Sequence, residues 1–406
     1  MSAMAEPSLH PAPGEQVPAR MAFVTSTPLS VAGGSGTYVG ISQLARALGD
    51  RDIRVEWHFP KWWSPSFTLK RILFNLRVAG RLRAGRYDWV VGFDLDGFQY
   101  GRCKTAPYIA SIKGVIADEL RNERGLVRML LQVQAGFERL AVQRADVVVA
   151  TSRYSAARIA EAYGIAPSKI AIVPESIDLQ AWDGEPRQPP VILADPPAIL
   201  SVAHMYPRKN LGLLLRACAD LRDSGVPFQV WIVGEGPCRQ AWERQRDELS
   251  LRSHVSFLGT IRLRELQDRY RRATLFCLPS RQEGFGIVFL EAMAFGKPVV
   301  SARAAAVPET VVDGETGLLV DPDDSTALAS ALARLLSDAD LCQSLGAAGR
   351  RRAELYRTDR VAASFLTTVG SALNGSSVSQ CLGGNSGSFQ AGAEHSLGRS
   401  WSGGGG

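Results

Sequence analysis

Two glutamates and two glycines in SRQEGFGIVFLEAMAFGKPVV (280–300) form the densest group of residues able to do chemistry. Glu283 stands just before a predicted helix, and Glu291 lies within it. An ionised carboxylate only accepts hydrogen bonds, so both side chains suit sugar hydroxyls. Gly284 and Gly286 let backbone N–H groups approach a ligand, and the positive end of the helix favours a phosphate. The glycine pair alone also fits an ordinary strand-to-helix turn, whereas the whole string favours a ligand site.

A second candidate is the pair Asp94 and Asp96 in FDLDGF (93–98), which follows a predicted strand. This D-x-D spacing is the one with which metal-dependent transferases of the GT-A fold hold a divalent cation. The pair lies in the first half of the chain and not beside the glutamates. We therefore interpret it as a loop or acceptor-side contact and predict no metal site.

A basic segment, FTLKRILFNLRVAGRLRAGR (67–86), has apolar residues at helical spacing and no acid within it. One interpretation is an amphipathic helix that packs on a sheet and keeps a solvated basic face. The other is contact with an anionic membrane near a lipid-linked acceptor, with Trp62, Trp63 and Phe67 as anchors. Nucleic-acid binding is not expected, because the net charge is only +6 and no recognition motif appears. The basic residues are Lys70, Arg71, Arg77, Arg81, Arg83 and Arg86.

The elements that must position these residues are short apolar strands alternating with helical patterns. Nearly continuous apolar strands indicate parallel sheets buried on both faces, and such sheets bind ligands at the carboxyl ends of their strands. A Pro-rich linker at 183–197 separates two such series. The sequence therefore predicts an α/β fold with two doubly wound, Rossmann-like domains facing a cleft. The predicted strands are 21–26, 53–59, 87–93, 108–112, 146–152 and 169–173, then 198–204, 228–234, 255–259, 275–279 and 297–301.

Length and composition agree with this organisation. A chain of 406 residues with 46% hydrophobic residues can form two sizeable cores, and six scattered cysteines form no Cys-x-x-Cys pair. Without an apolar leader or a run of about 18 apolar residues, we expect a cytoplasmic protein, peripheral at most on the inner face of the membrane. The expected divisions are a disordered start (1–19), an acceptor-side domain (20–190), a donor domain (191–352), a helix that packs back on the first domain (353–373) and a flexible Gly/Ser-rich tail (374–406).

The string around Glu283 and Glu291 resembles the E-x7-E element of the retaining family-4 glycosyltransferases, which have the GT-B fold. The resemblance covers roughly residues 20–370. It extends to GGSGTYVGISQLARAL (33–48), SVAHMYPRKN (201–210), VGEGP (233–237), VSFLG (255–259) and VVDGETGLLVDPDD (311–324).

The resemblance implies roles for individual residues. Glu283 would lie near the donor sugar, beside the backbone of Gly284, Phe285 and Gly286. Glu291 would bind the ribose hydroxyls. In the place of a metal, a lysine before a predicted helix would neutralise the diphosphate leaving group. That lysine is Lys209, in PRKN.

Other donor contacts would come from Gly33 and Gly34 on the first domain and from Gly234 in VGEGP. The chain departs from many relatives at two positions. His204 stands where they carry an arginine, and Lys113, a candidate catalytic and acceptor-side residue, stands where they carry a histidine. Lysine can donate hydrogen bonds to sugar oxygens but cannot replace an orienting imidazole.

The implied reaction is transfer of a hexosyl group from a UDP- or GDP-sugar to a glycan or lipid-linked acceptor, with retention and without a cofactor. Such a reaction belongs to cell-surface polysaccharide or glycolipid synthesis. Two alternatives remain: a sugar-nucleotide epimerase or phosphorylase of the same fold, and a non-catalytic nucleotide-sugar sensor. Assays over a panel of nucleotide sugars would separate them.

Overall fold

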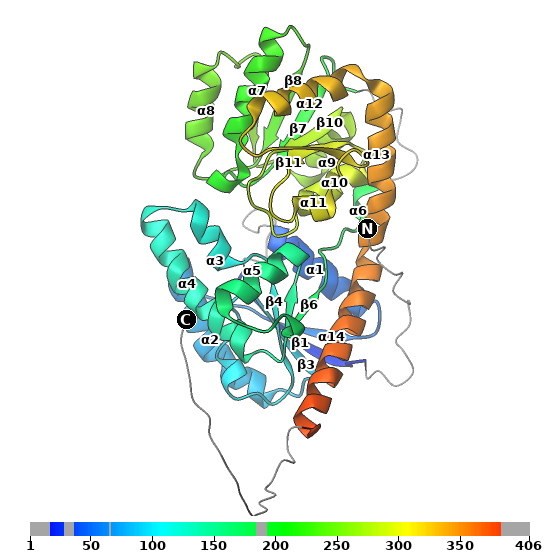
Figure 1. Cartoon of the computed structure of the whole chain (residues 1–406). Helices are drawn as coiled ribbons and strands as arrows, with labels where there is room; N and C mark the ends of the chain where they lie inside the picture. The colour runs from blue at the N-terminus through cyan, green and yellow to red at the C-terminus, as the bar shows by residue number, and fades with distance from the viewer. Residues whose placement is uncertain (1–16, 28–35, 65, 184–192, 383–406) are drawn as a thin grey trace, which may run out of the picture.

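The computed structural model describes residues 17–27, 36–64, 66–183 and 193–382. It consists of two α/β domains, one above the other in Figure 1, each built on its own six-stranded sheet. Every strand pairing within the two sheets is parallel. The predicted fold class, two doubly wound parallel-sheet domains, is confirmed.

The N-terminal sheet has the strand order β2-β1-β3-β4-β5-β6. Its central strands are buried along their whole length, as their apolar runs predicted. Helices cover both faces of this sheet, so apolar clusters lie on either side of it. The strands are β1 (Arg20–Val24), β2 (Arg54–His58), β3 (Trp89–Phe93), β4 (Tyr108–Ile112), β5 (Val147–Ala150) and β6 (Ile170–Ile172), and the helices are α1 (Gly36–Gly49), α2 (Phe67–Ala84), α3 (Ile116–Glu119), α4 (Gly125–Arg144) and α5 (Arg153–Tyr163).

The start and end of α5 show how the sequence sets local structure here. The Ser152 side chain accepts a hydrogen bond from the Ser155 N–H and caps the first turn. Gly164 ends the helix in the left-handed conformation, which costs glycine little. Because only two residues separate the end of β5 from the start of α5, the first turn of this helix lies at the carboxyl edge of the sheet.

The C-terminal sheet has the strand order β12-β11-β10-β7-β8-β9. Its last strand, β12, was not predicted from the sequence. The strands are β7 (Ala198–Val202), β8 (Gln229–Val233), β9 (Val255–Gly259), β10 (Leu275–Leu278), β11 (Val299–Ala302) and β12 (Gly317–Val320). The helices are α6 (Leu179–Asp183), α7 (Leu211–Asp223), α8 (Arg239–Glu248), α9 (Leu263–Arg272), α10 (Ile287–Ala294), α11 (Val307–Thr310), α12 (Ser325–Ser337) and α13 (Ala339–Ala353).

The chain passes between the domains twice, and the two crossings lie side by side. Ile177 and Trp182 already belong to the C-terminal core, so the first crossing comes earlier than the boundary expected at 190. The return crossing follows α13, where the Ile177 N–H donates to the Tyr356 carbonyl at 2.9 Å. Beyond it, α14 (Thr358–Leu382) runs down the N-terminal domain and continues past residue 373, into the segment expected to be a flexible tail.

The helix α14 is held by apolar contacts with the N-terminal core. Phe365 is 1% exposed, and its ring packs edge-on against Trp89 of β3 with 6.3 Å between ring centres. Val361, Ala362 and Val369 are buried in the same cluster. The end of the described chain thus covers the face of the first sheet.

We expect Phe365→Ala to lower the free energy of unfolding by about 3–5 kcal/mol, because it leaves a cavity between α14 and β3. Urea unfolding followed by circular dichroism measures this change. Leu355→Ala is the control, because Leu355 is 46% exposed, and its effect should be within about 0.5 kcal/mol. Equal effects of the two changes would show that α14 adds little to the stability of the domain.

Candidate active site

The strongest predicted pair meets where the C-terminal sheet faces the N-terminal domain. Glu283 follows β10, and Lys209 follows β7 in a single 3₁₀ turn. The Lys209 Nζ lies 2.6 Å from the Glu283 Oε1, and both side chains are nearly buried. The structure therefore brings two of the three candidate catalytic residues, Glu283 and Lys209, into direct contact, while Lys113 is the third.

Their surroundings set the charge of this pair. Burial raises the pKa of Glu283, but the cations Lys209 and Arg208 outweigh burial and hold that pKa below its ordinary value. Burial lowers the pKa of Lys209, and the Glu283 carboxylate opposes this effect. Glu283 is thus ionised at neutral pH and accepts a charge-assisted hydrogen bond from the lysine.

The second glutamate of the 280–300 segment is buried within the C-terminal domain. Glu291, in α10, is 8% exposed, and its Oε2 accepts a hydrogen bond from the Tyr270 hydroxyl at 2.9 Å. Burial raises the pKa of Glu291 to about 7, and the Tyr270 hydrogen bond only partly offsets this. The ring of Tyr270 is held by stacking on Phe276 and Phe295. Glu291 is therefore a fixed acceptor whose charge changes near neutral pH.

The loop that carries Glu283 is fixed through its backbone. The Glu283 carbonyl accepts from the Ala306 N–H at 3.3 Å, and the Phe285 carbonyl accepts from the Thr310 hydroxyl at 2.9 Å. Gly286 has a φ of 91° at the start of α10, a conformation that glycine adopts at little cost. The peptide planes beside Glu283 are thereby held in one orientation.

The remaining donor-side predictions are placed as follows. A Cβ on Gly234 would lie 2.0 Å from the Ala203 carbonyl oxygen, so this glycine permits close packing of two strand ends. His204, which follows Ala203 in the sequence, is exposed. Gly33 and Gly34 lie outside the described residues.

The N-terminal domain closes against this loop through the first turn of α5. The Gly284 carbonyl accepts from the hydroxyls of Thr151, Ser152 and Ser155 at 3.0, 2.8 and 3.1 Å. In the other direction, the Glu309 carboxylate accepts from two backbone N–H groups at the start of α5, each at 2.8 Å. A carboxylate at a helix N-terminus is favourable because the exposed N–H groups carry positive partial charge. The N-terminal domain thus donates hydrogen bonds to a carbonyl of the C-terminal domain, and the C-terminal domain caps the N-terminus of α5.

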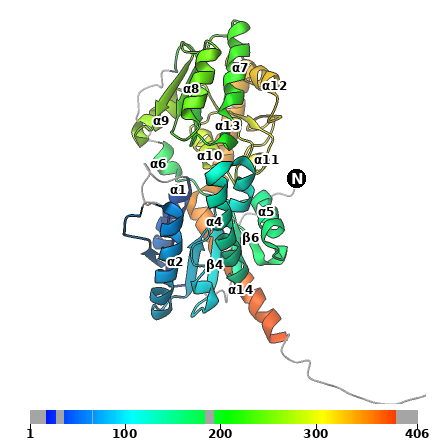
Figure 2. The same ribbon diagram turned by 90° about the vertical axis from the view of Figure 1, so that its left-hand side faces the viewer.

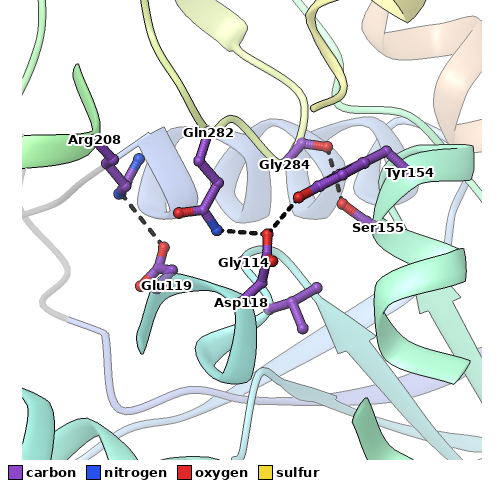
Figure 3. Close-up of a pocket in the computed structure, with 9 residues that line it drawn as sticks. Gly114, Asp118, Glu119, Tyr154, Ser155, Arg208, Gln282 and Gly284 are labelled. Atoms are coloured by element: carbon purple, nitrogen blue, oxygen red, sulfur yellow. Dashed lines mark hydrogen bonds and ion pairs between the residues drawn. The ribbon is translucent and has the colours of Figure 1, made fainter. Parts of the chain in front are cut away.

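A small cavity beside this contact is lined by both domains (Figure 3). The Asp118 Oδ2 accepts from the Gln282 side chain at 2.8 Å and from the Tyr154 hydroxyl at 2.7 Å. Arg208 lies 3.4 Å from Glu119 at the other end of the cavity. The residues next to Glu283 and Lys209 in sequence are therefore the ones that reach across to α3.

Lys113 lies at the carboxyl end of β4 and has a buried partner. Its Nζ is 2.9 Å from the Glu175 Oε1, with both side chains less than 10% exposed. A Cβ on Gly40 of α1 would lie 2.2 Å from the Glu175 carboxylate, so any other residue there would displace this carboxylate. The Lys113 carbonyl oxygen would lie 3.0 Å from a Cβ on Gly284. The predicted acceptor-side lysine thus borders the donor loop.

The D-x-D pair belongs to a buried network. The Asp96 carboxylate is fully buried and accepts from Asn75 and from the backbone and hydroxyl of Ser26. Arg71 lies 3.6 Å from Asp96 and 3.8 Å from Asp94. Burial raises the pKa of Asp94 to about 6. Among the described residues, no group of three or more His, Cys, Asp or Glu side chains is placed to hold a metal.

This network shows that the basic face expected for residues 67–86 is not wholly solvated. Arg71 is 6% exposed and points inward, where Asp94 and Asp96 compensate its charge. Arg83 donates to the carbonyls of Gln99 and Cys103. The pattern of strands and helices in the sequence does not predict which basic residue of a helix points inward. The orientation of that residue depends on its contacts with strands that are distant in the sequence.

Sequence reasoning missed Glu175, Asp118 and Glu309, which all act through residues distant in the chain. The Thr-Ser pair after β5 carried a usable signal, since polar residues at a carboxyl strand end border the ligand edge of such sheets.

Comparison with known proteins places this chain in a family. A sequence profile described as "Glycosyltransferase Family 4" matches residues 32–181, and one described as "Glycosyl transferases group 1" matches residues 184–352. A D-inositol 3-phosphate glycosyltransferase from Actinosynnema mirum is 31% identical over 320 residues, which is 73% of this chain and 75% of the relative.

A GDP-mannose-dependent alpha-(1-6)-phosphatidylinositol monomannoside mannosyltransferase from Mycolicibacterium smegmatis is 35% identical over 218 residues. The match takes in 51% of this chain and spans only 57% of that relative. Among solved structures, the sucrose-phosphate synthase of Thermosynechococcus elongatus has a TM-score of 0.69 at 21% identity, over 89% of this chain and 98% of the other. WaaG, a glycosyltransferase involved in lipopolysaccharide biosynthesis, has a TM-score of 0.68 at 20% identity, over 86% and 99%. These two likenesses show the fold.

Glu291 generates a prediction on pH. If Glu291 binds the ribose, as the family resemblance implies, its ionised carboxylate accepts from the hydroxyls more strongly than the protonated acid does. A pKa of about 7 leaves roughly half of the molecules protonated at neutral pH. Affinity for GDP or UDP should therefore rise as the pH increases from about 6 to about 8, by up to about tenfold. Calorimetric titration at several pH values measures this rise.

Two variants control for the titration of the nucleotide itself. Glu291→Gln should lose the part of the rise that belongs to the protein. Tyr270→Phe removes a hydrogen bond that lowers the pKa of Glu291, so the rise should move to higher pH. Superimposable curves for the wild type and Glu291→Gln would exclude Glu291 from the nucleotide site.

Proposed function

Because the chain belongs to glycosyltransferase family 4, we propose that it transfers a hexosyl group from a nucleotide diphosphate sugar to a lipid-linked or glycan acceptor, with retention of configuration. The observation that carries this proposal is the contact between Lys209 and Glu283 beneath the start of α10. A cation, an ionised carboxylate and a helix N-terminus at one strand edge suit a sugar attached to a diphosphate.

Each group has a distinct part in the proposed reaction. Lys209 stabilises the negative charge that develops on the departing diphosphate. Glu283 exchanges its lysine partner for hydroxyls of the donor sugar, and Glu291 binds the ribose. The leaving phosphate takes the acceptor proton, so no protein base is required. Positive side chains and a helix terminus supply the charge, and the reaction needs no divalent metal or other cofactor.

The relatives suggest a narrower substrate class. The mannosyltransferase from M. smegmatis is named for GDP-mannose and a phosphatidylinositol mannoside, and the A. mirum relative is named for inositol 3-phosphate. We propose GDP-mannose as the first donor to test and an inositol-containing glycolipid as the first acceptor. In this setting Lys113, held by Glu175, faces the acceptor and donates hydrogen bonds to its oxygens.

A second candidate is a nucleotide-sugar sensor without transferase activity. The buried Lys113–Glu175 pair supports it, because a lysine already engaged by a carboxylate has less capacity for an acceptor. Such a protein binds the donor but does not transfer the sugar, so a combined binding and activity assay separates the two functions.

We expect Lys209→Ala to reduce kcat by about a hundredfold or more, because the diphosphate charge is no longer compensated. The assay measures sugar transfer over a panel of UDP- and GDP-sugars, with thermal unfolding checked for each variant. Arg216→Ala is the matched control, since Arg216 is an exposed cation on α7 near Lys209 in sequence. Activity unchanged in Lys209→Ala would remove Lys209 from the site.

In the same assay, EDTA should cause no loss of transferase activity. A loss of activity that Mg²⁺ or Mn²⁺ restores would refute metal independence.

A lipid-linked acceptor requires contact with a membrane, and we propose that the exposed basic residues of α2 supply the attraction. No helix among the described residues is both long and apolar enough to span a bilayer. Arg77 and Arg81 are exposed, and Arg77 stacks over Trp62 at 5.0 Å. With Arg71 buried and Arg83 engaged, these two residues are the best placed to meet anionic lipids.

Replacing Arg77 and Arg81 by Gln should weaken binding to phosphatidylglycerol vesicles about tenfold or more, at about 1 kcal/mol per basic residue. Vesicle sedimentation at two salt concentrations measures this, and binding should fall as salt increases. The control is Arg216→Gln with Arg264→Gln, two exposed cations of the donor domain. If both double variants lose vesicle binding equally, the binding depends on the net charge of the protein and not on a specific contact of α2.

A further inference from the structure

The first half of α4 exposes an apolar surface that the active site does not use. Every residue from Arg124 to Leu130 is exposed, and five large apolar side chains lie on two adjacent rows of the helix. We call these five the α4 ridge: Leu126 (67% exposed), Val127 (50%), Met129 (63%), Leu130 (39%) and Val133 (49%).

The two halves of α4 differ in environment. In the second half, Ala135, Ala141 and Val142 are buried, and Glu138 is fully buried beside Tyr163. Single exposed apolar residues are common on protein surfaces, but five on one helix face mark a place where something binds. The α4 ridge therefore has no partner within the described chain.

The ridge continues onto the neighbouring helix α2. Gln134, one turn beyond Leu130, donates to Thr68 at 2.9 Å and accepts from Arg71 at 3.1 Å. Figure 2 shows α2 and α4 side by side on one face of the N-terminal domain. The first turn of α2 also exposes apolar side chains, Phe67 (47%) and Leu69 (49%), with Trp63 (82%) just before it.

Most charges around this surface are positive. Helix α2 contains no acid, and the only acid of α4 is the buried Glu138. Arg124 and Arg128 flank the ridge and are exposed, while Glu123, just before α4, is partly buried. An apolar strip with a basic border complements an anionic lipid surface.

We infer that the α4 ridge inserts into the interfacial layer of an anionic bilayer and docks the N-terminal domain there. This rests on the proposed function in requiring a lipid-linked acceptor, and it adds an apolar insertion site to the electrostatic contact of α2. A second copy of the chain is a poor occupant, because a symmetric contact would join two basic surfaces. Neither α2 nor α4 offers an exposed acid that could compensate Arg124 and Arg128.

The ridge lies close to the active site in the fold. Asn122, three residues before α4, donates to the Gln282 side chain at 2.6 Å, next to Glu283. Glu119, at the end of α3, contacts Arg208, next to Lys209. Insertion of the ridge therefore brings the mouth of the cleft to the lipid surface, where the head group of an acceptor lies.

The test uses the full chain and vesicles of phosphatidylglycerol and phosphatidylcholine that contain no acceptor. The triple variant Leu126→Ser, Met129→Ser, Val133→Ser changes only exposed side chains, and its partition onto vesicles should fall by about tenfold or more. Leu263→Ser, at an exposed leucine of α9 in the donor domain, is the matched control and should bind like the wild type.

Insertion depth is measured separately with brominated lipids, which quench tryptophan only within the bilayer. Met129→Trp should add a quenched signal, whereas Leu263→Trp should not. If the wild type binds and the triple variant binds equally, or if Met129→Trp is not quenched, the insertion site is refuted while the α2 contact stands. If the wild type does not bind vesicles, both membrane proposals fail, although sugar transfer to a soluble acceptor still tests the reaction. A dimer in sedimentation equilibrium that the triple variant dissociates would assign the ridge to a second copy.

Discussion

The arrangement of the active site depends on one carbonyl group, that of Gly284. Three hydroxyls at the end of β5 and the start of α5 lie within hydrogen-bonding distance of its oxygen. Because a carbonyl oxygen has two lone pairs, it can accept from two of these hydroxyls at once. The loop that presents Glu283 is thus completed by the opposite domain. Glu309 makes the reciprocal contact by capping α5. A donor loop held in this way takes its final geometry only when the domains are together.

Several carboxylates of the described residues are buried, and the charge of each is stabilised by different partners. Asp96 is compensated by Arg71 and hydrogen bonds, Glu175 by Lys113, and Glu283 by Lys209. Glu291 has only a tyrosine hydroxyl, and its pKa accordingly rises to about 7. The three ion pairs join strands or helices far apart in sequence, so they fix the relative positions of elements as well as charge. Of these four acids, Glu291 alone faces no cation and changes its charge near neutral pH.

The sequence allowed most of the fold and the centre of the site to be predicted. Continuous apolar strands required parallel sheets, and the string around Glu283 required a strand-to-helix turn at a ligand edge. The short strand β12 (Gly317–Val320) lacked this clear pattern and was missed. The partners of Lys113 and Arg71 were also missed, because charge pairing between elements distant in the sequence leaves no local signal. The roles inferred for Gly33, Gly34 and His204 stay predictions.

The paired chain crossings have a mechanical consequence. Ile177 and Tyr356 are joined by a backbone hydrogen bond, and Ile177 forms an isolated parallel bridge with Arg357, so both connections between the domains pass one point. Short connections that meet at one point favour rotation of one domain relative to the other, as in hinge motions. The ring of Tyr356 also packs edge-on against Phe285, next to Gly284, with 5.5 Å between ring centres. A side chain at the crossing therefore contacts the loop that carries Glu283, so a rotation of one domain relative to the other changes the surroundings of that carboxylate.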